Sequence, residues 1–292
     1  MKLAGSYVAL ATPFSRDGSI DEAAFRALIR RQLKSGTSGL VPCGSTGEAA
    51  TLTHEEYRRL ISISVEEAGR LPVIAGVGAN ATAKAIELSQ EAQALGANAI
   101  LLLAPYYNKP TQDGLFAHFR AVARGVDVPI IVYNIPGRTA VNILPQTLVK
   151  MAKACPNIIA VKEASGSVEQ VSEIISLAPK NFTVLSGDDN LTLPMMAVGA
   201  KGVVSVVANI APRQTAALCA AALSGDYIRA RGIHLKMFPL VKALFLETNP
   251  IPVKAALCLM GLSSPIMRLP LTEASLAAKA ALKAELKAFG PI

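Results

Sequence analysis

The hydrophobic pattern of this chain changes period repeatedly between its start and about residue 224. Short apolar runs alternate with longer segments in which apolar residues recur every three or four positions, the spacing of an amphipathic helix. Most of the short runs are continuously apolar, which is typical of parallel strands covered on both faces. The sequence therefore predicts strands over residues 7–11, 39–42, 72–76, 99–103, 129–133, 158–162, 182–186 and 202–206.

Helix-start signals open the segments between these runs. Asp21 and Glu22 begin the first, and Thr53 with Glu56 has the spacing of a capping box. Further helices are expected over residues 111–124, 144–154 and 167–177. Repeated strand-then-helix units indicate an α/β protein with a (β/α)8 TIM barrel. A doubly wound open sheet is the alternative. The glycine stretch at residues 76–80, however, follows the third predicted strand and lacks the third glycine of a dinucleotide fingerprint.

Beyond residue 224 the pattern predicts helices only, over residues 227–246, 253–260 and 272–288. Pro250 and Pro252 mark the break between the first and second of these helices, and Pro265 and Pro270 mark the break between the second and third. We therefore predict a catalytic barrel over residues 1–224 and a C-terminal helical domain over residues 225–292.

Composition narrows the classes of function. The net charge is +8, but the basic residues are scattered and no long basic run occurs, which argues against a nucleic-acid partner. The apolar stretches are too short to cross a bilayer, and the first one runs into Thr12, Pro13 and Phe14 as a strand would. We therefore expect no membrane partner and a cytoplasmic location.

Cysteine and histidine spacing gives no support to metal chemistry. Cys43, Cys155, Cys219 and Cys258 form no CxxC pair, and the three histidines lack the HExxH spacing. We expect no metal site and no disulfide framework.

Polar residues follow the predicted strands repeatedly, at the end where barrel enzymes place their active sites. Lys162 ends the sixth strand, and Tyr133 ends the fifth. A lysine amine in a low-dielectric site loses stabilisation of its charged form, and the neutral amine attacks ketones to give a Schiff base. A nearby phenol is able to carry the protons of that reaction. Position alone leaves open a lysine that extends to solvent and a tyrosine that only caps the core.

Two further features suit carboxylate binding. The GSTGE loop at residues 44–48 offers backbone N–H groups and hydroxyls beside a helix start, and Arg138 offers a bidentate clamp. Each is weak alone, since a simple turn and an exposed loop charge are the plainer interpretations. Their occurrence at successive strand ends is what favours an active site.

The motifs together resemble the 4-hydroxy-tetrahydrodipicolinate synthase family, within the class I pyruvate-dependent aldolases that include N-acetylneuraminate lyase. The resemblance covers essentially the whole chain. It rests on GSTGE, PYYNKP (105–110), YNIPGRT (133–139), VKEASG around Lys162, SGDD (186–189) and NPIPVK (249–254).

The resemblance implies a lyase that holds pyruvate as a Schiff base on Lys162 and needs no other cofactor. Tyr133 would shuttle protons with Ser45 and Tyr107, and Tyr107 would reach across a tight dimer interface. The remaining implied pocket residues are Thr46, Gly187 and Val204 around pyruvate and Arg138 on the carboxylate of L-aspartate 4-semialdehyde. The product, 4-hydroxy-tetrahydrodipicolinate, would enter diaminopimelate and lysine synthesis, and the assembly would be a homotetramer.

Two departures from the family pattern matter. Ser45 stands where the family often has threonine, and GSTGE is also the form typical of N-acetylneuraminate lyases, so that lyase or another 2-keto-3-deoxy sugar acid aldolase is the alternative function. The second departure concerns feedback. The residues at the regulatory cleft implied by the resemblance are Ala50, His54, Tyr57, Asn80, Lys84 and Tyr106.

Lysine-inhibited relatives offer a carboxylate and a histidine where this chain has Lys84 and Tyr57. A like charge facing a lysine ligand is repulsive, so we expect weak or absent inhibition by lysine. A catalytically silent keto-acid sensor would be expected to lose Lys162 or Tyr133, and a metal-dependent barrel lyase lacks convincing ligands.

Overall fold

The computed structural model describes residues 1 and 3–290, and its eight strands form one parallel sheet that curves into a barrel. The strand order is β2-β1-β8-β7-β6-β5-β4-β3. The β2 and β3 edges meet through a parallel bridge between Leu40 and Val73, which brings the barrel close to full closure. The predicted TIM barrel is therefore confirmed, and the open doubly wound sheet is excluded.

The strands agree with the apolar runs within a few residues. They are β1 (Gly5–Ala9), β2 (Gly39–Val41), β3 (Ile74–Val77), β4 (Ala99–Leu103), β5 (Ile130–Asn134), β6 (Ile158–Glu163), β7 (Thr183–Ser186) and β8 (Gly202–Ser205).

The first strand begins two residues earlier than expected because small residues form its start. Gly5 pairs with Gly202, and a Cβ on Gly202 would lie 1.9 Å from the Gly5 carbonyl oxygen. The strand also ends earlier than expected, since the Ala11 N–H donates to Asn209 Oδ1 instead of joining a strand. An apolar run does not reveal a close approach of two glycines.

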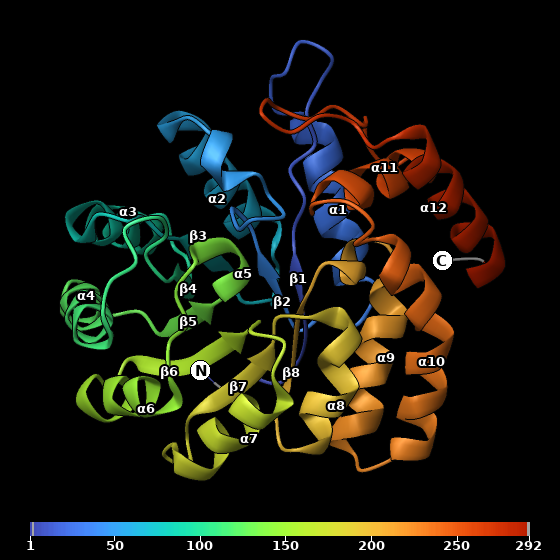
Figure 1. Cartoon of the computed structure of the whole chain (residues 1–292). Helices are drawn as coiled ribbons and strands as arrows, with labels where there is room; N and C mark the ends of the chain where they lie inside the picture. The colour runs from blue at the N-terminus through green and yellow to red at the C-terminus, as the bar shows by residue number, and fades with distance from the viewer. Residues whose placement is uncertain (2, 291–292) are drawn as a thin grey trace.

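Helices surround the strands on the outside of the barrel (Figure 1). The barrel helices are α1 (Glu22–Leu33), α2 (His54–Glu67), α3 (Thr82–Ala94), α4 (Gln112–Arg124), α5 (Pro136–Thr139), α6 (Pro145–Ala154), α7 (Val168–Leu177), α8 (Thr192–Ala197) and α9 (Pro212–Leu223), with short 3-10 turns at η1 (Ala49–Thr51), η2 (Asp189–Leu191) and η3 (Val207–Asn209). The expected helix starts are confirmed: the Asp21 side chain caps α1, and Thr53 with Glu56 forms the capping box of α2.

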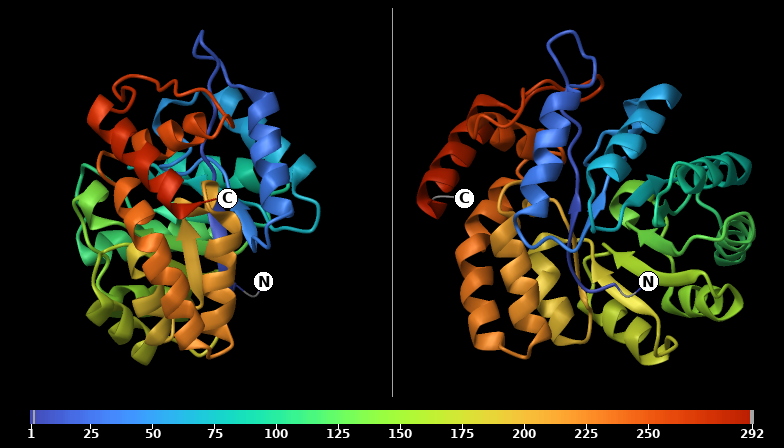
Figure 2. Two further views of the ribbon diagram at one scale, coloured as in Figure 1. Left: turned by 90° about the vertical axis from the view of Figure 1, so that its right-hand side faces the viewer. Right: turned by 180° about the vertical axis from the view of Figure 1, so that it is seen from behind.

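The chain then continues as helices only: α10 (Tyr227–Ala243), α11 (Ile251–Leu259) and α12 (Leu276–Phe289). These helices gather on one side of the barrel, and α11 and α12 lie near α1 (Figure 2). One apolar cluster joins them to the barrel through Leu28 of α1 and Val206 and Val207 after β8. The C-terminal segment is therefore packed against the barrel near the ends of its strands. None of the described helices is long and apolar enough to cross a membrane.

Candidate active site

Lys162 and Tyr133 meet at the ends of neighbouring strands. The two residues are register partners between β6 and β5. The Lys162 Nζ lies 4.0 Å from the centroid of the Tyr133 ring. Both side chains are buried, with 6% and 5% of the residue surface exposed. An amine and a phenol therefore share one enclosed site at the mouth of the barrel.

Gly187, directly after β7, leaves room for the Lys162 side chain. A Cβ at Gly187 would lie 2.6 Å from the Ala164 Cβ and 3.2 Å from the Lys162 Cε. The first of these distances is shorter than real Cβ contacts, so a larger residue here would displace its neighbours. Asp188 follows, and burial raises the pKa of its carboxyl while the nearby Lys162 charge opposes that rise.

A buried polar pair supports the site from the next positions on the same two strands. Asn134 Nδ2 donates to both carboxylate oxygens of Glu163 at 3.1 Å, and the Ser165 N–H donates to Glu163 Oε1 at 2.8 Å. Burial raises the pKa of the Glu163 carboxyl, while these hydrogen bonds oppose the rise. No role for this pair was predicted from the sequence. Its signal was a pair of polar residues immediately after Tyr133 and Lys162.

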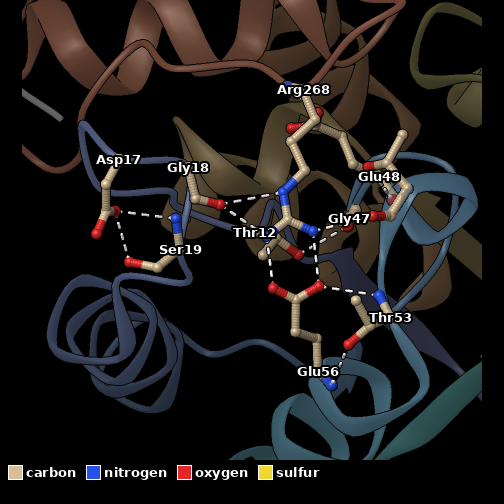
Figure 3. A network of polar contacts seen from close by, with 10 residues as sticks. Thr12, Asp17, Gly18, Ser19, Gly47, Glu48, Thr53, Glu56 and Arg268 are labelled. Carbon is tan, nitrogen blue, oxygen red and sulfur yellow. Dashed lines mark hydrogen bonds and ion pairs between the residues drawn. The ribbon is translucent and has the colours of Figure 1, made fainter.

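The loop at residues 44–48 lies beside the same mouth and is tightly held. Thr46 is buried, and its Oγ1 accepts a hydrogen bond from Asn249 Nδ2 at 3.0 Å. Thr12 Oγ1 donates to the Gly47 carbonyl at 2.7 Å, a contact drawn in Figure 3. Ser45 is only partly buried. The loop therefore presents the hydroxyls of Ser45 and Thr46 from a backbone fixed on both sides.

Asp189 ties the ends of β7 and β8 together. Its Oδ1 accepts from Ser205 Oγ at 2.5 Å, and its Oδ2 accepts from the N–H groups of Val206 and Val207 at 2.9 and 3.1 Å. These contacts hold the end of the strand that carries Val204, which is buried on the inner face of the barrel. This role of Asp189 was not predicted from the sequence.

Not every predicted site residue contacts the others in the structure. Tyr107 has a φ of 74° and is 87% exposed. Among the described residues, no hydrogen bond connects the hydroxyls of Ser45, Tyr107 and Tyr133. Arg138 is exposed on α5, and its NH2 group donates to the Asn249 carbonyl at 2.8 Å.

The residues of the implied regulatory cleft lie on α2, α3 and the loops nearby. His54 Nε2 is 3.0 Å from Glu91 Oε1 of α3, and Lys84 Nζ is 2.7 Å from Glu87 Oε1. The Asn80 carbonyl accepts from Asn108 Nδ2 at 2.8 Å, which links it to the loop of Tyr106. The remaining members differ in exposure, since Tyr57 is buried while Ala50 and Tyr106 are exposed.

A parallel (β/α)8 barrel with a buried lysine beside a tyrosine at its mouth is an arrangement that suits a Schiff-base lyase. The sequence model of the dihydrodipicolinate synthetase family matches residues 2–289. The chain belongs to this family.

Individual relatives agree over nearly full length. The 4-hydroxy-tetrahydrodipicolinate synthase of Pelobacter propionicus is 51% identical over 289 residues, 99% of each chain. That of Maridesulfovibrio salexigens is 51% identical over 293 residues, 100% of each chain. The crystal structure of dihydrodipicolinate synthase from Aquifex aeolicus superposes with a TM-score of 0.96 at 50% identity, covering 98% of this chain and 97% of that one.

Proposed function

We propose that this chain condenses pyruvate with L-aspartate 4-semialdehyde to give 4-hydroxy-tetrahydrodipicolinate, the first committed step of diaminopimelate and lysine synthesis. The full-length similarity to synthases of that name supports the substrates. The observation that carries the chemistry is the placement of Lys162 Nζ 4.0 Å from the Tyr133 ring centroid in a buried site.

Lys162 provides the nucleophile and the only covalent carrier, with no added cofactor. Its neutral amine attacks the ketone carbon of pyruvate, and the resulting carbinolamine loses water to form an imine. Loss of a methyl proton gives the enamine, whose carbon attacks the aldehyde of the second substrate. The amine of that substrate then displaces Lys162 as the ring closes. Tyr133 carries protons in these steps, with Ser45 and Tyr107 as the other members of the relay.

Carboxylate binding orients both substrates. Thr46 holds the carboxylate of pyruvate, in a pocket lined by Gly187 and Val204. Arg138 holds the carboxylate of L-aspartate 4-semialdehyde through its guanidinium. Support comes from the Asn249 residue, whose side chain contacts Thr46 and whose carbonyl accepts from Arg138. A common neighbour, Asn249, supports the assignment of Thr46 and Arg138 to one site.

The assembly we propose is a homotetramer, a dimer of dimers located in the cytoplasm. The 87% exposure of Tyr107 suits a residue that completes the site of a partner subunit. A second surface lies on α10, where Ile228 and Leu235 are 80% and 61% exposed. Apolar exposure of this kind is typical of an interface. Sedimentation of the wild-type chain tests the assembly directly.

The decisive experiment measures product formation from the two substrates, with borohydride trapping of the pyruvate imine. Turnover that Lys162→Ala abolishes, with a pyruvate adduct on Lys162 in the wild type, would support the proposal. An adduct without turnover would leave the Schiff base in place and point to a sugar acid aldolase. The absence of both the adduct and turnover would overturn the central claim.

Arg138→Ala separates the two substrates. It removes a charge-assisted hydrogen bond to the second carboxylate, so the KM for L-aspartate 4-semialdehyde should rise about tenfold or more. Formation of the pyruvate adduct should be unaffected. A lower yield of adduct in this variant would place Arg138 on pyruvate instead.

A further inference from the structure

Three contacts from the C-terminal segment converge on the loop of residues 44–48, about 200 residues earlier in the chain. Asn249 Nδ2 donates to Thr46 Oγ1 at 3.0 Å, and Lys254 Nζ lies 2.5 Å from Glu48 Oε1. The Arg268 backbone N–H lies 3.3 Å from Glu48 Oε2. The loop that presents Thr46 is thus held in place by residues of the C-terminal segment, which follows the barrel in the sequence.

The pair of Glu48 and Lys254 is fully enclosed, because each side chain is only 1% exposed. Lys254 Nζ also lies 4.2 Å from the centroid of the Phe14 ring. Burial lowers the pKa of Lys254, and the Glu48 carboxylate opposes that change. A buried ion pair adds little net stability compared with an apolar pair, although breaking it leaves an uncompensated charge. The pair therefore acts mainly by fixing the geometry around Glu48.

That geometry is a constrained backbone. Glu48 has φ 54° and ψ 36°, a left-handed conformation that is uncommon for a residue with a side chain. Arg268 holds the following turn, since its guanidinium binds the Thr51 carbonyl. It also binds the Gly18 carbonyl and both carboxylate oxygens of Glu56 (Figure 3). The loop is consequently fixed at Glu48 and again at the start of α2.

The contact from Asn249 leaves the proton of the Thr46 hydroxyl free. A threonine hydroxyl has one proton to donate. Because Thr46 Oγ1 accepts the Asn249 side-chain N–H, its own proton is available to a different acceptor. The carboxylate of pyruvate is the acceptor that the proposed function places there.

We propose that Lys254 and Asn249 are positioning residues for pyruvate: Lys254 fixes the loop through Glu48, and Asn249 directs the Thr46 hydroxyl toward the substrate carboxylate. This inference rests on the proposed function. Neither residue touches the reacting carbon, so their loss weakens pyruvate binding more than turnover at saturation.

The experiment compares Glu48→Gln/Lys254→Met, which removes both charges, and Asn249→Ala with the single variants Glu48→Gln and Lys254→Met. Lys279→Met is the control, because Lys279 forms a partly exposed pair with Glu273 on the same C-terminal segment. For each protein the measurements are thermal stability, kcat, the KM for each substrate and the pyruvate concentration that half-saturates borohydride trapping on Lys162.

The double variant should recover the thermal stability that the single variants lose, since no unpaired buried charge remains. Its KM for pyruvate and its half-saturation concentration should nevertheless rise about tenfold, the worth of one charge-assisted hydrogen bond, with kcat nearly unchanged. Asn249→Ala should show the same rise in the pyruvate KM and in the half-saturation concentration as the double variant. Lys279→Met should match the wild type in all of these measurements.

An unchanged pyruvate KM in a stable double variant, or in Asn249→Ala, would overturn the inference and leave these residues a purely structural role. Failure of the proposed function looks different, because the wild type itself would then give no pyruvate adduct on Lys162.

Discussion

Lys162 and Tyr133 face each other because parallel pairing places them side by side on β6 and β5. Register partners in a sheet point their side chains to the same face. The 4.0 Å separation of the Lys162 Nζ from the Tyr133 ring centroid is therefore set by strand register. Rigid strands are better suited than loops to hold a nucleophile beside its proton carrier.

Tyr133→Phe should separate proton transfer from packing. The ring stays, while the hydroxyl that we assign to proton transfer is lost. We expect kcat to fall by about 10²–10⁴, the usual range for a general acid–base group. The melting temperature should change little, since no protein hydrogen bond from this hydroxyl is present among the described residues. Steady-state kinetics and thermal melting test the prediction, and a kcat close to wild type would remove Tyr133 from the mechanism.

Gly187→Ala should damage the site by crowding Lys162. The added Cβ would lie 2.6 Å from the Ala164 Cβ and 3.2 Å from the Lys162 Cε. Displacing a nucleophile by about 1 Å can cost about a hundredfold in rate, so we expect a loss of that order in the rate of pyruvate trapping.

Gly232→Ala is the matched control for this substitution. Gly232 lies exposed on α10, and a Cβ there would meet nothing within 4 Å. Its trapping rate should equal that of the wild type, and its stability should be unchanged or higher, since alanine favours helix. Equal trapping rates for Gly187→Ala and Gly232→Ala would show that a methyl group at position 187 does not displace Lys162.

The barrel and its paired lysine and tyrosine were predictable from the sequence because each depends on a short segment. An apolar run of strand length that ends in Lys162 or Tyr133 predicts that this residue lies at the end of a strand. The parallel order of the strands then brings such ends together. The capping box at Thr53 and Glu56 is local in the same way.

Contacts between distant segments were not predictable in this manner. The sequence does not indicate that Lys254 meets Glu48, or that Asn249 bonds to Thr46, because about 200 residues separate the partners. The Asp189 contacts to Ser205 and the backbone after it depend on the same kind of tertiary placement. The proposed role of Tyr107 in a partner's site would depend on contacts between chains, which a pattern of strands and helices does not encode.

Free lysine should inhibit this enzyme weakly or not at all. In the implied cleft Lys84 would face the ammonium group of the ligand, and two like charges about 4 Å apart repel by about 1 kcal/mol even in water. Product formation measured across a lysine titration tests this expectation, with Lys84→Glu as the comparison that reverses the local charge. Submillimolar inhibition of the wild type would contradict the prediction.

The stability of the protein should depend on the titration of His118. This residue lies on α4 with 5% of its surface exposed, and its Nδ1 is 3.0 Å from Thr82 Oγ1. Burial lowers the pKa of His118 to about 4. The pKa of an unfolded histidine is near 6.5. Between about pH 4 and pH 6.5, His118 is therefore protonated in the unfolded chain and neutral in the folded chain. Stability is then fully present above about pH 6.5 and is lost as the pH falls toward 4.

The size of this loss follows from the two pKa values and amounts to about 3 kcal/mol across the interval. Denaturant unfolding at several pH values between 7.5 and 4 measures it, with His118→Gln as the control. Carboxylates such as Glu67, whose pKa two arginines lower, titrate in both proteins and cancel in the comparison. The stability difference between wild type and variant should therefore shift by about 3 kcal/mol against the wild type on acidification. Parallel pH profiles for the two proteins would mean that His118 accepts its proton as readily in the folded chain as in the unfolded one.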